Sequence, residues 1–178
     1  MKLQFHTEGN VSLPVISIRG KIFLFLGILT LLFVLPALLH SQWITGPLVN
    51  ALLLVAAVLL GPLEAVVLGL LPSTVAMSFG LLPLPLAPAI PVIVLGNAAL
   101  ALTFTAARRW GFFPAAGLAA LAKFLVIYVG ALHLLASLFR VKLAEDVAIM
   151  LSWPQLVTAL AGGLLAWMAL SLLKHRDR

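Results

Sequence analysis

Residues 22–63 read IFLFLGILTLLFVLPALLHSQWITGPLVNALLLVAAVLLGPL and contain no Asp, Glu, Lys or Arg. A membrane-spanning helix needs about 20 apolar residues, so this stretch is long enough for two crossings. Residues 65–107 form a second uncharged stretch. The 178-residue chain is 63% hydrophobic and 9% charged, whereas soluble domains carry about 25% charged residues. This composition excludes soluble and disordered proteins and predicts an integral membrane protein.

Turn signals divide the apolar sequence into six spans. Gly61-Pro62 marks the boundary between the second and third, since Gly suits the position after a helix and Pro the first turn of the next. Pro72 predicts a kink within the third span. Four prolines in residues 83–91 exclude a regular helix there. The predicted spans cover residues 22–39, 46–60, 62–79, 91–107, 114–138 and 153–173.

The distribution of basic residues predicts the orientation of these spans. The net charge is +6, and most Lys and Arg lie before the first span, between the fourth and fifth, or after the sixth. Six crossings place these three regions on one side of the membrane, which the positive-inside rule makes the cytoplasm. We therefore expect an all-α membrane protein of the cell membrane, a six-transmembrane-helix bundle with both termini cytoplasmic. Residues 1–20 form a polar segment, a hairpin or an interfacial segment, and residues 21–178 a single six-helix membrane domain.

Polar side chains inside the spans are concentrated in the outer halves, which predicts a pocket open to the exterior. The residues that we expect to bind a substrate there are Asn97, Lys123, Gln155, Asn50, Trp153 and Tyr128. Each has an alternative role. The asparagines can join helices by hydrogen bonds, and the two aromatic residues can lie at the membrane interface.

Lys123 is the most informative of these residues. A lysine at the centre of a spanning helix costs roughly 2.5–3.5 kcal/mol on insertion scales, and its neighbours Leu121, Ala122 and Phe124 are apolar. It therefore needs a carboxylate, a cavity or a group of carbonyls. Glu64 is the acidic residue within the spans, so either a Lys123–Glu64 pair or an acidic group on a ligand would satisfy Lys123.

No enzyme chemistry is predicted. The chain has no Cys, and its sequence contains no P-loop, no paired-carboxylate site and no metal-binding spacing of His and Glu. We expect no catalytic residues, no metal, no cofactor and no nucleic-acid partner. A small intramembrane enzyme is the weakest alternative, since no nucleophile accompanies His40, Lys123 and His133.

Several motifs together resemble the substrate-binding S component of an energy-coupling factor (ECF) transporter. The motifs are Gly46-Pro47-Leu48-Val49-Asn50-Ala51, Leu60-Gly61-Pro62, the segment from Pro83 to Pro88, Ile90 to Ala98, Ala122-Lys123-Phe124, and Trp153 to Ala159 with Gly162-Gly163. The resemblance covers roughly residues 45 to 165, and it rests on the order and spacing of these motifs.

The resemblance implies a function and partners. S components bind a vitamin or similar micronutrient in an outward-facing pocket and associate with a membrane coupling subunit and two ATPase subunits. Asn97, Lys123 and Gln155 fall on the motif positions. The resemblance also implies two lid elements, at residues 40–45 and 83–91.

One feature departs from the family pattern. Many S components carry Ala-x-x-x-Ala on the first helix for docking to the coupling subunit, and the first span here has no such pair. Small residues are spaced in this way at Ala115/Ala119 and Ala116/Ala120 on the fifth span, where ordinary helix packing also explains them. The alternative function is a structural or scaffolding membrane protein without a small-molecule ligand, whose polar residues only join helices.

Overall fold

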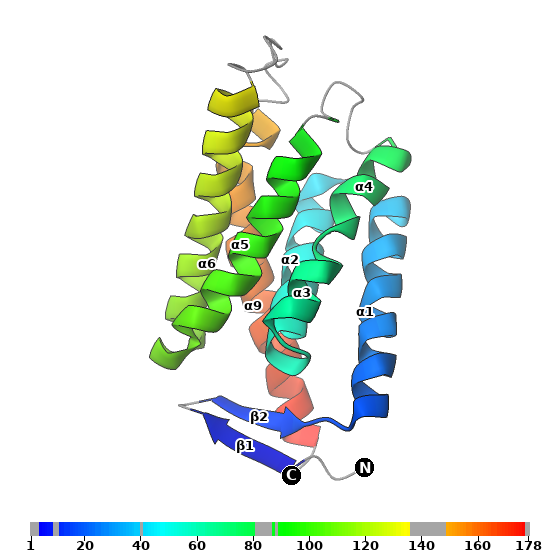
Figure 1. Ribbon diagram of the computed structural model, residues 1–178, viewed down its shortest axis with the longest axis vertical. Helices are drawn as coiled ribbons and strands as arrows, with labels where there is room; N and C mark the ends of the chain where they lie inside the picture. Colours follow the sequence, from blue (N-terminus) through cyan, green and yellow to red (C-terminus); the bar gives the residue numbers. More distant parts are fainter. Residues whose placement is uncertain are drawn as a thin grey trace.

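The computed structural model describes residues 4–8, 11–39, 41–80, 87, 89–135 and 149–176. Apart from one short hairpin, these residues form a bundle of helices (Figure 1). The hairpin pairs β1 (Gln4–Glu8) with β2 (Val11–Val15) in antiparallel register. The helical elements are α1 (Ile18–Leu38), α2 (Gln42–Leu59), α3 (Pro62–Leu68), α4 (Leu71–Ser78), α5 (Ile90–Ala107), the 3-10 turn η2 (Arg108–Trp110), α6 (Phe112–Tyr128), its π-helical extension η3 (Val129–Leu135) and α9 (Trp153–Arg176).

Five of these helices are long and apolar enough to cross a membrane: Ile18–Leu38, Gln42–Leu59, Ile90–Trp110, Phe112–Ala131 and Trp153–Lys174. Helices suit a bilayer because all their backbone hydrogen bonds are internal. Their outward sides carry large exposed apolar residues, such as Phe23 on α1, Leu95 on α5 and Met168 on α9. An apolar surface of this extent is typical of contact with lipid. The described part of the chain is thus that of a helical membrane protein.

The predicted third span is not one helix. α3 ends at Leu68 and α4 begins at Leu71, so the chain is interrupted at Gly69 and Leu70. Pro72 lies in the first turn of α4; it has no N–H to bond to Leu68, and its ring clashes with that carbonyl in a continuous helix. The sequence therefore predicts the disturbance but not its extent, and the prediction of six helices of spanning length is not confirmed.

Other helix boundaries lie close to the predicted ones. Gly61, with φ of 135°, separates α2 from α3, as Gly61-Pro62 predicts. α1 and α2 each begin four residues before the predicted spans, and at α1 Ser17 Oγ accepts a hydrogen bond of 3.2 Å from Gly20 N. Of the two predicted lid elements, residues 40, 83–86 and 88 lie outside the described residues.

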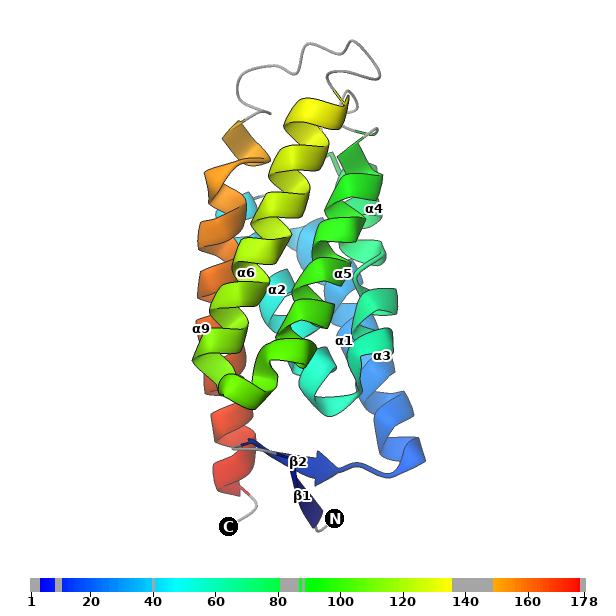
Figure 2. The ribbon, with the colours of Figure 1, turned by 60° about the vertical axis from the view of Figure 1, so that its left-hand side comes forward.

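The hairpin, the start of α1 and the end of α9 lie at one end of the bundle (Figure 1). We call the opposite end the far end; α2, α5 and α9 all begin there. Figure 2 shows α6 lying between α5 and α9, with α2 behind them and α1 on the other side of the molecule. α2 is the central helix, packed against α1, α3, α5 and α9.

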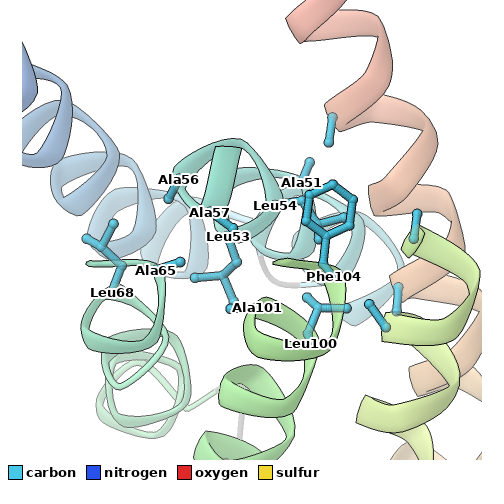
Figure 3. Close-up of a cluster of buried hydrophobic side chains, with 14 of the residues drawn as sticks. Ala51, Leu53, Leu54, Ala56, Ala57, Ala65, Leu68, Leu100, Ala101 and Phe104 are labelled. Carbon is cyan, nitrogen blue, oxygen red and sulfur yellow. The ribbon is translucent and has the colours of Figure 1, made fainter. Parts of the chain in front are cut away.

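The larger hydrophobic core lies mostly in the half of the bundle nearer the hairpin, and a smaller cluster of Ala89, Ile127, Ala131 and Leu151 lies toward the far end. Figure 3 shows the larger core as apolar side chains of α2, α3 and α5 pointing at one another, with Leu53, Leu100 and Phe104 at its centre. The alanines of both predicted small-residue pairs on α6 are buried in this core: Ala115, Ala116, Ala119 and Ala120. They pack helices within this chain, and a Cβ placed on Gly163 of α9 would lie 3.2 Å from Ala116 Cβ. These pairs are therefore not an exposed docking surface.

Candidate functional site

Lys123 lies in the interior of the bundle, on α6, between two asparagines from other helices. Its Nζ donates hydrogen bonds to Asn50 Oδ1 on α2 at 2.5 Å and to Asn97 Oδ1 on α5 at 2.7 Å. The three side chains are 4%, 1% and 2% exposed. Three helices thus bring one charge and two amides to a single buried point.

The acceptors found for Lys123 are neutral amides rather than a carboxylate. Glu64, the predicted alternative partner, lies in the first turn of α3 beside Gly61, where a Cβ would come within 2.7 Å of Glu64 Oε2. A carboxylate in the first turn is favoured by the helix dipole. Amide oxygens can solvate an ammonium without cancelling its charge, so a protonated Lys123 has no carboxylate bonded to it among the described residues.

Asn97 also forms a hydrogen bond to the backbone at the interruption between α3 and α4. Its Nδ2 donates to the carbonyl of Gly69 at 2.9 Å, in a buried position. An unpaired carbonyl in an apolar interior is costly, so this bond stabilises the break that Pro72 imposes. The close approach of this backbone to α5 requires glycine at position 69, because a Cβ on Gly69 would lie 3.0 Å from Asn97 Cβ.

A cavity of about 120 Å³ adjoins this polar group. It lies toward the far end, beyond the hydrophobic core: Asn97 is seven residues into α5, or about 10 Å along it. Its wall combines neutral polar side chains, the Lys123 ammonium and apolar residues. The lining residues are Gln42, Thr45, Gly46, Val49, Asn50, Pro72, Ser73, Ile93, Asn97, Lys123, Met150, Leu151, Gln155 and Thr158.

One wall residue has an unsatisfied polar atom. Ser73 Oγ is buried and has no hydrogen-bond partner in the described part of the chain, and the side chain is 5% exposed. In contrast, the hydroxyls of Thr74 and Ser78 on the same helix bond to the Leu71 and Thr74 carbonyls. Because buried hydroxyls nearly always find a partner, Ser73 Oγ is available to a group that enters the cavity.

Two glutamines fix the segment that precedes α9. Gln42 Nε2 and Gln155 Nε2 each donate to the carbonyl of Met150 at 3.0 Å. Met150 and Leu151 also line the cavity. The start of α2 and the start of α9 therefore hold this segment against the cavity through one shared acceptor.

The structure brings four of the six predicted site residues together at the cavity and places the other two elsewhere. Asn50, Asn97, Lys123 and Gln155 line the cavity. Trp153 does not; its ring packs on Trp43 with centroids 5.5 Å apart, and the two are 54% and 53% exposed. Tyr128 does not either, since it packs on Phe124 and His133. Both positions suit the alternative role at the membrane interface.

Several wall residues were not predicted from the sequence, although the sequence pattern indicates some of them. Gln42 and Thr45 lie on the same helix face as Gly46, Val49 and the predicted Asn50, but the predicted second span began at residue 46. Thr158 follows Gln155 by three residues on the same face of α9. Met150 carries no such signal, because its contribution is a backbone carbonyl.

No cluster of three or more His, Cys, Asp or Glu side chains that could hold a metal occurs among the described residues. The polar groups of the cavity are amides, hydroxyls and one ammonium, which bind organic groups by hydrogen bonding. In comparisons with known proteins, no family model, no curated protein and no solved structure matches this chain.

Proposed function

We propose that this protein is the substrate-binding membrane subunit of an ECF-type uptake transporter for a vitamin or similar micronutrient. The observation that carries the proposal is the Lys123 ammonium in the wall of a cavity, with neutral amides as its bonded partners. Buried ionisable groups in membrane helices are costly and are usually functional. A cavity beside such a group, lined by further polar side chains, is the arrangement expected of a ligand site.

The proposal includes six membrane crossings. Five are the long apolar helices, and the sixth is the pair α3 and α4, whose shorter apolar stretch is Pro62–Val75. In this arrangement the interruption at Gly69 lies beside the cavity, where Asn97 binds its carbonyl. Interrupted helices are tolerated in membranes where the freed backbone groups find partners, and transporters use them at binding sites.

The proposed orientation has the hairpin end in the cytoplasm. Arg108 and Arg109 in η2, Lys21 near the start of α1 and Lys174 near the end of α9 lie toward that end. The positive-inside rule favours the cytoplasm for such residues. The cavity, toward the far end, then opens to the exterior, as uptake requires.

Energy for uptake comes, in this proposal, from partner subunits. The chain contains no P-loop, so a membrane coupling subunit and two ATPases would supply ATP hydrolysis. The buried alanines of α6 exclude these pairs as the docking surface. Docking would therefore use another face of the bundle.

A scaffolding protein without a small-molecule ligand is the alternative, and one observation favours it. Lys123, Asn50, Asn97 and the Gly69 carbonyl form a connected hydrogen-bonded network across four elements. Such a network can serve only to join helices. The cavity and the unpaired Ser73 Oγ are not explained by that role.

Co-purification separates the two functions. The full chain, tagged and expressed from its native locus, is isolated from mild-detergent membranes and analysed for co-isolated proteins and small molecules by mass spectrometry. A transporter subunit should bring two ATPases and a coupling subunit, and wild-type protein should carry a small molecule that is absent from Lys123→Ala. Isolation of wild-type protein with neither ATPases nor a bound molecule would show that the transport proposal is wrong.

A further inference from the structure

The charge of the cavity restricts what can bind in it. Lys123 is the one ionisable residue among the described residues that line it, and its bonded acceptors are neutral. A ligand with one negative charge would neutralise this site, whereas a neutral ligand would leave the ammonium unpaired. A cationic ligand would add repulsion in a region of low dielectric, where charges interact strongly.

Two donors of the cavity wall, beside the N–H groups of its amides, are suited to the two oxygens of a carboxylate. An ammonium has three N–H donors, and two of those on Lys123 are bonded to Asn50 and Asn97. The third N–H and the unpaired Ser73 hydroxyl remain as donors in the wall of the same cavity. Hydrogen bonds to an ionised acceptor are about twice as strong as those between neutral groups.

A phosphate matches the site less well. Phosphate monoesters carry about −1.5 to −2 charges at neutral pH and have three strong acceptor oxygens. One ammonium leaves part of that charge unpaired inside the membrane. Arginine, which binds phosphate through two parallel hydrogen bonds, is absent from the described residues that line the cavity.

The size and the apolar part of the wall restrict the rest of the ligand. The cavity volume is about 120 Å³, close to the 150 Å³ or so of an engineered cavity that holds benzene. Val49, Pro72, Ile93 and Leu151 supply apolar wall. A compact apolar body about the size of a six-membered ring therefore fits beside the polar group.

We infer that the cavity binds a small monocarboxylate, with one carboxylate oxygen on Lys123 Nζ and the other on Ser73 Oγ, and with its apolar body against Val49, Ile93 and Leu151. The inference rests on the proposed function and adds the chemical class of the substrate. It also gives Ser73 a role as a specificity-determining residue.

The test is a titration of the purified full chain in lipid nanodiscs with three probes of the same shape. These are benzoate, benzamide and phenylphosphate, in a buffer without other carboxylates. We expect saturable benzoate binding at millimolar or lower concentration, and binding at least about tenfold weaker for the other two. Benzamide or phenylphosphate binding as tightly as benzoate would overturn the inference, and so would the lack of saturable benzoate binding.

Two serines of α4 provide a matched pair of variants. Ser73→Ala removes the unpaired hydroxyl and should weaken benzoate binding about tenfold or more, as expected for a hydrogen bond to a charged group. It should leave the thermal stability of the ligand-free protein unchanged or raised, since Ser73 Oγ has no hydrogen bond to lose within the described ranges. The hydroxyl of Ser78 is exposed and bonded within α4. Ser78→Ala should therefore leave benzoate binding unchanged. Equal benzoate affinities for wild type and both variants would contradict the role of Ser73.

The outcome for the inference is separable from that for the transport function. If wild-type protein co-purifies with ATPases and with a bound molecule that lacks a carboxyl group, the monocarboxylate inference is wrong and the transporter proposal stands. If wild-type protein binds benzoate through Lys123 and Ser73 but brings down no ATPase from native membranes, the ligand class is supported and the ECF assignment is wrong.

Discussion

Lys123 joins three helices, because it lies on α6 and both of its bonded acceptors belong to other helices. Asn50 lies on α2 and Asn97 on α5. Removal of the side chain would therefore leave two buried amide oxygens without this donor, and a ligand without its counter-charge. Arginine at the same place would keep the charge and supply further N–H donors, though in a larger side chain.

The effect of replacing Lys123 on ligand retention should thus depend on whether the new side chain keeps the positive charge. We expect Lys123→Ala to lower retention of a bound small molecule by at least about tenfold, and Lys123→Arg to lower it much less. Quantitative mass spectrometry of the molecule released from equal amounts of folded protein provides the measurement. Equal and mild losses in the two variants would count against a ligand role for Lys123.

Asn97 has a structural role as well, because it bonds both Lys123 and the Gly69 carbonyl. Asn97→Leu removes both bonds and should destabilise the fold by roughly 1–3 kcal/mol, the usual effect of leaving buried polar groups unpaired. Thr105→Val on the same helix is the control, since Thr105 Oγ1 bonds only to the Ala101 carbonyl one turn back. Unfolding curves in mixed detergent should separate the two variants, and indistinguishable curves would contradict this role of Asn97.

At the scale of elements, the close contact of α2 with α9 positions Asn50. A Cβ on Gly162 of α9 would lie 2.5 Å from Asn50 Cβ and 2.8 Å from the Pro47 carbonyl. Small residues allow membrane helices to approach so closely. The glycine pair in the sixth predicted span therefore affects the site indirectly, through the placement of α2.

Gly162→Ala should separate these helices and disturb Asn50. We expect it to lower the stability by roughly 1–3 kcal/mol, as overpacking does, and to weaken ligand retention at the same time. Gly27→Ala is the matched control, because a Cβ on Gly27 of α1 would meet nothing within 4 Å. That variant should be neutral or more stable by up to about 1 kcal/mol, since alanine favours helix. If thermal melts show both variants to be less stable than wild type, or both more stable, this account of the α2–α9 contact is refuted.

The elements also show what the sequence could and could not predict. Uncharged runs and Gly61-Pro62 suffice to locate the long helices, because helix length and turn residues are local properties. The extent of the break after Leu68 depends on Asn97, which is 28 residues away and satisfies the freed carbonyl. Similarly, Lys123, Asn50, Asn97 and Gln155 can be predicted from their depth in the spans. The unpaired hydroxyl of Ser73 cannot be predicted in this way, because its lack of a partner depends on how several helices pack.

At the scale of the whole molecule, the larger apolar core and the cavity lie mostly in different halves of the bundle. Leu53, Leu100 and Phe104 lie in the half nearer the hairpin, while Asn50, Asn97 and Lys123 adjoin the cavity toward the far end. A larger apolar core at one end and a cavity beside a smaller apolar cluster at the other suit a protein that holds a ligand on one side of a membrane.

The orientation of the bundle can be tested by single cysteines, since the chain has none. We expect Ser152→Cys, just before α9, to react with a membrane-impermeant maleimide in intact cells. Lys174→Cys, near the end of α9, should react only after permeabilisation. The reverse pattern would place the cavity on the cytoplasmic side and contradict an uptake role.

Native mass spectrometry of the protein released directly from membranes tests the central claim, that the cavity beside Lys123 holds a small molecule for a transporter. Wild-type protein should carry one additional small mass and associate with ATPase subunits, and Lys123→Ala should lose the small mass while keeping those subunits. If wild-type protein and Lys123→Ala are both detected bare and without partners, the cavity is only a packing feature and the account is wrong.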